Sequence, residues 1–155
     1  MESFVICRAE PRDAAALTQI ALAAKRYWGY PERWLDLWKT ELTLTAEYIA
    51  ANMVNKACTG EAAVGFYSLL FTAQAAELDH LWVLPGFIGQ GIGRCLWEHA
   101  AAQAARGGAQ RLAVLSDPHA TEFYRRMGMT PTGESAYSLE GERRSLPRLE
   151  FVLNR

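Results

Sequence analysis

One stretch, residues 76–106, constrains the fold of this chain more than any other. Residues 76–84 alternate as a β-strand requires, because successive side chains of a strand point to opposite faces, and Pro85 ends the run. Four glycines then fall within residues 86–93, and a helix is expected from there to about Arg106, where two glycines close it. A strand that passes through a glycine-rich turn into a helix predicts an α/β fold.

The rest of the chain supplies elements in the order β-α-α-β-β-β-α-β-α-β-β. Further strands are expected at about 4–9, 54–59, 62–72, 112–116, 134–139 and 145–153. Further helices are expected at 14–27, in one or two pieces within 32–53, and from Asp117-Pro118 to Met127. No linker or repeat interrupts the order, so we expect a single domain over residues 1–155, with a mixed sheet of six or seven strands and about four flanking helices.

Composition excludes several classes of protein. Half of the 155 residues are hydrophobic and 21% are charged, so the chain can fill a core. The net charge of −1 argues against a nucleic-acid partner, and no apolar run is long enough to cross a bilayer. Three cysteines without close spacing indicate reduced thiols and a cytoplasmic location, and we expect no metal site.

The glycine-rich turn predicts a site for phosphate groups. Glycines let backbone N–H groups converge on one point, and a helix N-terminus adds a partial positive charge. A Walker loop would need Lys after its last glycine, whereas Ile92 follows Gly91 here. A dinucleotide fingerprint would need a third glycine where Arg94 or Leu96 stands, depending on the register. Both nucleotide-binding interpretations are therefore disfavoured.

The same turn resembles the signature of the GNAT superfamily of N-acetyltransferases, Arg/Gln-x-x-Gly-x-Gly/Ala. Gly91 and Gly93 match the two later positions, and Ile88 stands where the family has Arg or Gln. A second segment, Asp117-Pro-His-Ala-Thr-Glu-Phe-Tyr124, is similar to the family's Asn-x-x-Ala-x-x-Phe-Tyr, with Asp in place of Asn. The two motifs occur in the family's order, and the element order resembles the family over the whole chain.

This resemblance implies a GNAT-type fold with splayed fourth and fifth strands, and acetyl-CoA as the co-substrate. The pantetheine arm would pair with the backbone of Leu81, Trp82 and Val83. The pyrophosphate would bind Ile88, Gly89, Gln90, Gly91, Ile92, Gly93 and Arg94, and Asp117 and Tyr124 would also contact the cofactor. Members of the family often dimerise, which leaves a homodimer open.

The resemblance also implies transfer of an acetyl group to a primary amine by direct attack in a ternary complex. Tyr124 would protonate the departing thiolate; the alternative is a buried helix aromatic. Glu77 and Asp79 share one strand face and either could take the proton of the amine, directly or through water. The alternative is that both are solvated strand residues and that a water chain removes the proton. His80 is expected on the opposite face.

The acceptor is expected to be a small-molecule or peptide amine that binds after the first helix. Trp28 and Tyr30 would line its pocket and could hold an apolar amine or stack on a cation, whereas Trp34 and Trp38 are expected to be core residues. Residues 61–90 contain Glu61, Glu77 and Asp79 but no Lys or Arg, which suggests that this stretch attracts a cationic amine. A non-catalytic acyl-CoA-binding or sensor module of the same fold is the alternative function.

Overall fold

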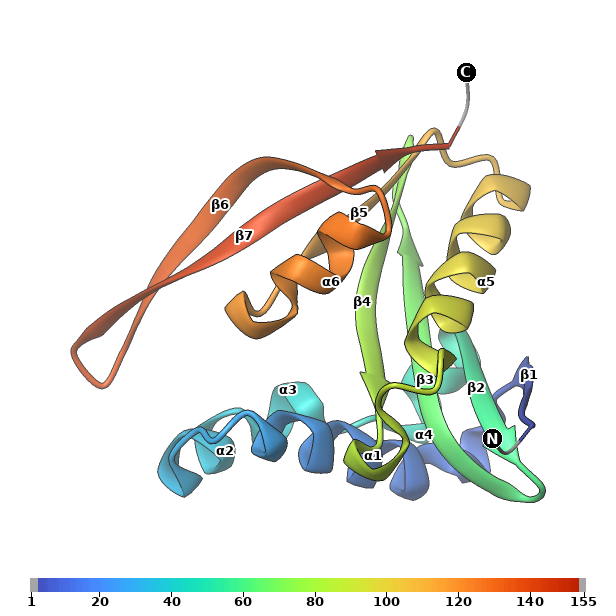
Figure 1. The fold of residues 1–155 in the computed structure, drawn as a ribbon, viewed down its shortest axis with the longest axis horizontal. Helices are drawn as coiled ribbons and strands as arrows, with labels where there is room; N and C mark the ends of the chain where they lie inside the picture. Colours follow the sequence, from blue (N-terminus) through green and yellow to red (C-terminus); the bar gives the residue numbers. More distant parts are fainter. Residues whose placement is uncertain (1–2, 154–155) are drawn as a thin grey trace. The chain divides into compact units, whose positions relative to one another are not determined.

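The computed structural model describes residues 3–153 and divides into two compact units. The first unit comprises the chain up to Leu69 together with His80–His99, and the second comprises Leu70–Asp79 and Ala100 to the C-terminal end. The chain passes from one unit to the other within two strands and one helix, β3 (Ala62–Phe71), β4 (Ala75–Val83) and α5 (Ile92–Arg106), which Figure 1 labels.

The observed element order is the order that the sequence predicts, except that residues 32–53 contain three short helices in place of the expected one or two. The described residues therefore contain six α-helices instead of about four. Strands are β1 (Val5–Arg8), β2 (Met53–Thr59), β3, β4, β5 (Arg111–Leu115), β6 (Thr130–Leu139) and β7 (Glu142–Val152). Helices are α1 (Ala14–Tyr27), α2 (Glu32–Leu37), α3 (Lys39–Leu42), α4 (Ala46–Ala51), α5 and α6 (Thr121–Arg126), with 3-10 turns η1 (Pro11–Asp13), η2 (Pro85–Phe87) and η3 (Pro118–Ala120). Within residues 3–153, no helix is long and apolar enough to cross a membrane.

The strands form one mixed seven-stranded sheet in the order β1-β2-β3-β4-β5-β7-β6. β4 and β5 are parallel, whereas β1 with β2, β2 with β3, β5 with β7 and β6 with β7 are antiparallel. The parallel register joins Ala75–Glu77 to Arg111–Ala113, while β4 continues to Val83 and β5 to Leu115. The expectation of an α/β fold with a mixed sheet is therefore confirmed.

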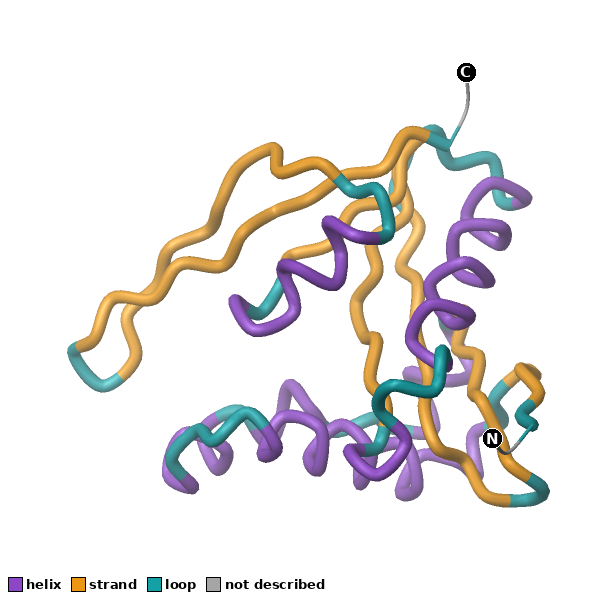
Figure 2. Tube along the Cα trace, in the orientation of Figure 1, coloured by secondary structure: helices purple, strands orange, loops and turns teal. Residues whose placement is uncertain are grey.

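The first unit carries the helices α1–α4, which follow one another directly before β2 (Figure 2). Its core is built from the apolar faces of these helices and from β2 and β3, with Leu17, Ile49 and Phe66 almost completely buried. Thr45 caps α4, because its Oγ1 accepts a hydrogen bond from the backbone N–H of Tyr48 at 3.0 Å. Gly29, with a φ of +82°, turns the chain between α1 and α2.

The second unit contains β5, α6 and the long twisted hairpin of β6 and β7, which is visible in Figures 1 and 2. Its core contains Leu112, Val114 and Leu149. β6 begins at Thr130, earlier than the sequence predicts, because Pro131 and Gly133 are accommodated at a register shift instead of ending the strand. A tight turn that contains Gly141, with a φ of +82°, joins β6 to β7.

Candidate functional site

The glycine-rich turn after β4 has the backbone conformation of an anion-binding loop. η2 follows the strand, and Gly89 and Gly91 then adopt φ angles of +87° and +85°. A side chain is strained at such angles, so the conformation itself requires glycine at both positions. A Cβ atom built at either glycine meets no atom within 4 Å. The space beside this backbone is therefore open to a ligand.

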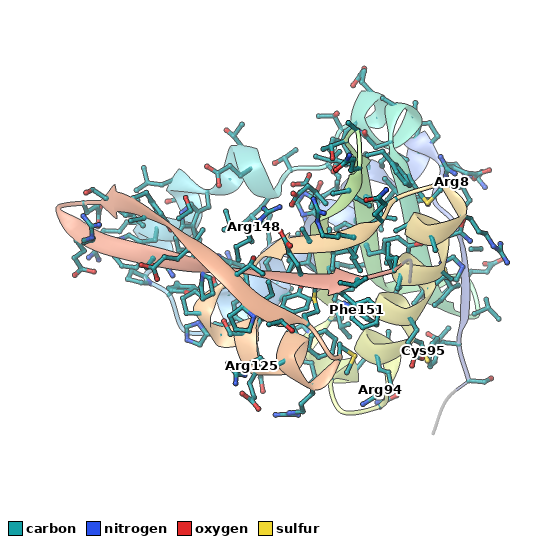
Figure 3. All side chains as sticks on the ribbon, turned by 90° about the horizontal axis from the view of Figure 1, so that it is seen from above. Arg8, Arg94, Cys95, Arg125, Arg148 and Phe151 are labelled. Atoms are coloured by element: carbon teal, nitrogen blue, oxygen red, sulfur yellow. The ribbon has the colours of Figure 1, made fainter. Side chains whose placement is uncertain are left out.

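The N-terminus of α5 adds donors to this turn. The first hydrogen bond of the helix runs from the N–H of Cys95 to the carbonyl of Gly91 at 3.1 Å, so the N–H groups of residues 92–94 have no partner within the helix. Arg94, labelled in Figure 3, has a side chain that is 58% exposed and lies 4.0 Å from Glu98. Ile88 is exposed at 52%, so it leaves the turn accessible. Backbone donors at the start of a helix favour a bound anion.

The last part of β4 is fixed by its own side chains. Trp82 Nε1 donates a hydrogen bond to His80 Nδ1 at 2.9 Å, which places the proton of a neutral imidazole on Nε2. His80 is only 9% exposed and packs on Phe66, with ring centroids 5.8 Å apart. Asp79 is exposed, so the alternation expected for this strand is confirmed. His80 is a buried residue that orients Trp82.

Aromatic residues after α1 lie next to this strand segment. The ring centroids of Trp28 and Trp82 are 5.7 Å apart, and both side chains are half-buried. Trp34 and Trp38 are 8% and 6% exposed, as expected for core residues, and Tyr30 packs edge-on against Trp38 at 4.9 Å. Trp28 and Tyr30 are therefore the more accessible members of the cluster.

In the second unit, Asp117 begins the turn that leads to α6. Its Oδ1 accepts a hydrogen bond from the N–H of His119 at 2.9 Å and lies 3.0 Å from His119 Nδ1. The Asp117 side chain is 7% exposed, whereas the imidazole is 45% exposed. The sequence predicted the cap but not the contact with the imidazole, which no spacing rule indicates.

Tyr124 is buried on α6, with 5% of its surface exposed. Burial raises the pKa of its hydroxyl well above the ordinary value, and the negative charge of Asp117 raises it further. Its ring packs edge-on against Phe123 at a centroid distance of 5.2 Å. The hydroxyl is therefore protonated at neutral pH and has a proton to donate.

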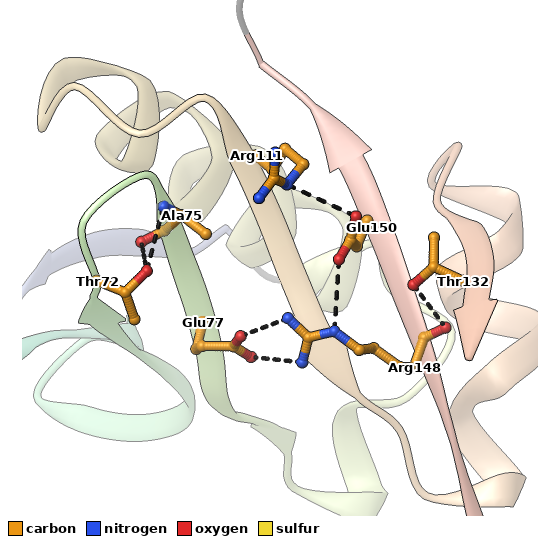
Figure 4. A network of polar contacts seen from close by, with 7 residues as sticks. All are labelled: Thr72, Ala75, Glu77, Arg111, Thr132, Arg148 and Glu150. Carbon is orange, nitrogen blue, oxygen red and sulfur yellow. Dashed lines mark hydrogen bonds and ion pairs between the residues drawn. The ribbon is translucent and has the colours of Figure 1, made fainter. Parts of the chain in front are cut away.

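Glu77, on β4, is held in an ion-pair network that the sequence does not reveal (Figure 4). Arg148 of β7 donates from Nη2 to Glu77 Oε1 at 2.7 Å and from Nη1 to Oε2 at 3.4 Å. Its Nε donates to Glu150 at 3.4 Å, and Arg111 lies 3.6 Å from the same carboxylate. The hydrogen bond to Glu77 raises the pKa of Arg148 despite partial burial. Both carboxylate oxygens of Glu77 thus face a permanent cation.

The predicted site residues fall into two groups. The first unit holds Leu81–Val83, the turn Ile88–Arg94, and the aromatic residues Trp28 and Tyr30. The second unit holds Glu77, Asp79, Asp117 and Tyr124. Among residues 3–153, no group of three or more His, Cys, Asp or Glu side chains could hold a metal ion.

Comparison with known proteins places this arrangement in context. The model of the acetyltransferase (GNAT) family matches residues 15–129. No curated protein matches the chain significantly in sequence. Similar solved structures include a GCN5-related N-acetyltransferase (aminotransferase, class II) from Rhodopseudomonas palustris, which is 23% identical with a TM-score of 0.81 over 99% of this chain and 98% of that one.

Two further structures were determined with a ligand. The PaiA N-acetyltransferase of Thermoplasma acidophilum, in complex with coenzyme A, is 18% identical with a TM-score of 0.77 over 97% of this chain and 99% of that one. The YncA acetyltransferase of Salmonella typhimurium, with acetyl-CoA, is 19% identical with a TM-score of 0.74 over 99% of this chain and 95% of that one. At these identities the likeness is one of fold.

Proposed function

Because the chain belongs to the acetyltransferase (GNAT) family, we propose that it transfers the acetyl group of acetyl-CoA to a primary amine of a small molecule or peptide. The observation that carries this proposal is the match of the family model over residues 15–129, which includes the glycine-rich turn and the Asp117–Tyr124 segment. Two structures of the same fold hold coenzyme A or acetyl-CoA, which supports acetyl-CoA as the co-substrate.

The proposed cofactor site uses mainly backbone groups. The N–H groups of Ile88–Arg94 would bind the pyrophosphate, supported by the left-handed glycines and by the N-terminus of the 15-residue helix α5. Loss of the family's Arg or Gln at Ile88 removes a side chain but no backbone donor. The backbone of Leu81–Val83 would pair with the pantetheine arm, and the N–H of Val83 would stabilise the oxyanion.

The reaction needs a group that removes a proton from the attacking amine and a second group that stabilises the departing thiolate. The attacking amine must be neutral, although an alkylamine has a pKa near ~10 in water. The departing thiolate gains from a donated proton or hydrogen bond. We assign the stabilisation of the departing thiolate to Tyr124. Since burial raises its pKa above that of a thiol, Tyr124 stabilises the leaving thiolate chiefly as a hydrogen-bond donor.

We assign the removal of the proton from the attacking amine to Asp79 in preference to Glu77. Protonation of Glu77 would break its two contacts with the Arg148 guanidinium, at 2.7 and 3.4 Å. Asp79 lies two residues further along the same face of β4 and is exposed, so water reaches its carboxylate. In this arrangement Glu77 and Arg148 hold the strand in place, and Asp79 accepts the proton of the amine directly or through water.

The proposal is tested with purified protein, acetyl-CoA and a panel of amines, amino acids, polyamines and peptides, by following the released thiol and identifying the acetylated product by mass spectrometry. Tyr124→Phe is expected to lower kcat about 10²-fold with little change in the KM for acetyl-CoA. Tyr137→Phe, on β6, is the matched control, because it removes the same hydroxyl from a group that contacts Arg144. Binding of acetyl-CoA without turnover of any amine would support the sensor function instead.

A further inference from the structure

Two cysteines that are far apart in the sequence lie on neighbouring strands of the first unit. β1 and β2 pair antiparallel, with Val5 opposite Cys58 and Cys7 opposite Lys56. Residues two apart on a strand point to the same face, so Cys7, Lys56 and Cys58 share one face of this strand pair. We refer to Cys7 and Cys58 as the thiol pair.

The two thiols differ in their access to solvent and interact with each other. Cys7 is exposed on β1, the edge strand of the sheet, whereas Cys58 is buried with 6% of its surface exposed. Burial raises the pKa of the Cys58 thiol, and the charge of Lys56 lowers it. A charge interaction and a hydrogen bond with Cys7 also raise this pKa. The side chain of Cys7 therefore lies next to that of Cys58.

Lys56 gives a second measure of this proximity. Its Nζ lies 3.0 Å from Asp13 Oδ2, and the two side chains are only 17% and 15% exposed. The hydrogen bond with Asp13 raises the pKa of Lys56, and the charges of Cys58 and Cys7 raise it further. The ion pair with Asp13 thus holds one ammonium group within electrostatic range of both thiols.

A bond between the two sulfur atoms requires only a small movement of β1. Diagonal positions of a regular antiparallel ladder lie about 7–8 Å apart between Cα atoms, and a disulfide requires about 4.4–6.8 Å. β1 has four residues and pairs with β2 alone, whereas β2 is also paired with β3. Few hydrogen bonds hold β1, so an approach of about 1 Å is within its reach.

We propose that Cys7 is a modification site for small disulfides such as glutathione disulfide, and that Cys58 resolves the adduct into a Cys7–Cys58 disulfide. The Cys7 thiolate attacks one sulfur of glutathione disulfide, its S–S bond breaks, and the departing glutathione takes up the proton that Cys7 lost. The Cys58 thiolate then attacks the sulfur of Cys7 and releases the second glutathione in the same way. Two protein thiols are oxidised to one disulfide, and one glutathione disulfide is reduced to two glutathione molecules.

The disulfide closes a loop that contains the helices α1–α4. A cross-link across a long loop restricts the unfolded chain and so favours the folded state. The oxidised protein should therefore melt at a temperature at least about 5 °C higher than the reduced protein. An unchanged or lower melting temperature would mean that the fold must be distorted to form the bond, and would overturn the proposal.

Peptide mapping by mass spectrometry tests the proposal without relying on acetyl transfer. The reduced, folded protein is incubated with glutathione disulfide, and the remaining thiols are alkylated with N-ethylmaleimide. The wild-type protein is expected to give one linked pair, Cys7 with Cys58, while Cys95 is alkylated. A disulfide that involves Cys95, a stable glutathione adduct on Cys7, or the absence of any disulfide would overturn the proposal.

Three variants assign the order of the steps. Cys58→Ser removes the resolving thiol, so the glutathione adduct on Cys7 should accumulate. Cys7→Ser removes the exposed thiol and should slow the incorporation of glutathione at least about 10-fold. Cys95→Ser is the matched control, because this thiol is partly exposed but lies on α5, outside the strand pair, and closure should be unchanged (Figure 3).

A comparison of folded and unfolded protein tests whether the strand register drives closure. In the wild-type protein, the second step should be at least about 10-fold faster in the folded state than in urea, because the register holds the two thiols together. Equal rates in the two states would overturn the proposal. If Cys58→Ser or Cys7→Ser does not fold, the wild-type peptide map and this comparison still decide the question.

Discussion

The ion pair between Glu77 and Arg148 offers a direct test of how the β4 carboxylates divide their roles. The two side chains are 29% and 36% exposed and share contacts of 2.7 and 3.4 Å. Exposed pairs contribute at most about 1 kcal/mol, whereas removing one partner of a buried pair costs about 3–5 kcal/mol. Partial exposure with bidentate geometry places the coupling between Glu77 and Arg148 near ~1 kcal/mol.

A double-mutant cycle measures this coupling. The wild-type protein, Glu77→Gln, Arg148→Met and the double variant are unfolded in urea and followed by tryptophan fluorescence. The coupling free energy should be about 1 kcal/mol at low salt and should decrease at about 1 M salt, where the screening length is about 3 Å. A coupling below about 0.3 kcal/mol, or one that salt does not change, would refute the assignment of an electrostatic clamp.

Two variants of β4, Asp79→Asn and Glu77→Gln, distinguish a general base from a residue with only an electrostatic role in the activity assay. Asp79→Asn should lower kcat about 10²-fold, because it removes the proposed proton acceptor. Glu77→Gln should lower kcat less than about 10-fold, since the amide keeps the shape of the side chain and loses only the ion pair. If Glu77→Gln costs as much activity as Asp79→Asn, then Glu77 accepts the proton despite its contacts with Arg148.

Three other perturbations test the geometry. Gly91→Ala forces an L-residue to a φ of +85° and should raise the KM for acetyl-CoA about 10-fold, whereas Gly86→Ala, which lies outside the Ile88–Arg94 segment and has open space for a Cβ, should leave it unchanged. Gly65→Ala places a Cβ 3.0 Å from the Trp82 carbonyl oxygen and should lower the free energy of unfolding by about 1–3 kcal/mol in urea titrations. Desolvation opposes ionisation of Asp13, but the hydrogen bond from the Glu10 N–H and the Lys56 ion pair at 3.0 Å outweigh it and lower its pKa. As the pH falls, the unfolded state therefore binds this proton at a higher pH than the folded state does. The contribution of Asp13 to stability, measured by thermal melts, should be complete above about pH 4 and be lost at lower pH.

The features that the sequence predicts well depend on residues close together in the chain. Alternation places Asp79 and His80 on opposite faces of β4, and a single threonine hydroxyl marks the start of α4. The left-handed turn follows from glycine spacing alone. The early start of β6 is missed because Pro131 and Gly133 normally signal a loop, and only pairing with β7 shows that a register shift absorbs them.

The features that escape sequence analysis depend on register between distant strands or on a helix-to-helix turn. Glu77 and Arg148 are 71 residues apart, and nothing in either local pattern identifies the partner. The β-strand registers place Glu77 beside Ala113 and Ala113 beside Glu150, so the charged ladder exists only once three strands are aligned. The position of Lys25, whose Nζ lies 4.2 Å from the centroid of the Trp38 ring, likewise depends on the direction in which Gly29 turns the chain.

The contacts of the charged residues change the interpretation of the charge pattern in the sequence. The acid-only stretch 61–90 suggested attraction of a cationic amine, yet the charge of Glu77 is matched by Arg148 in the second unit. Of the acids in that stretch, Glu77 is therefore committed to an ion pair, whereas Asp79 is exposed on the same face of the strand.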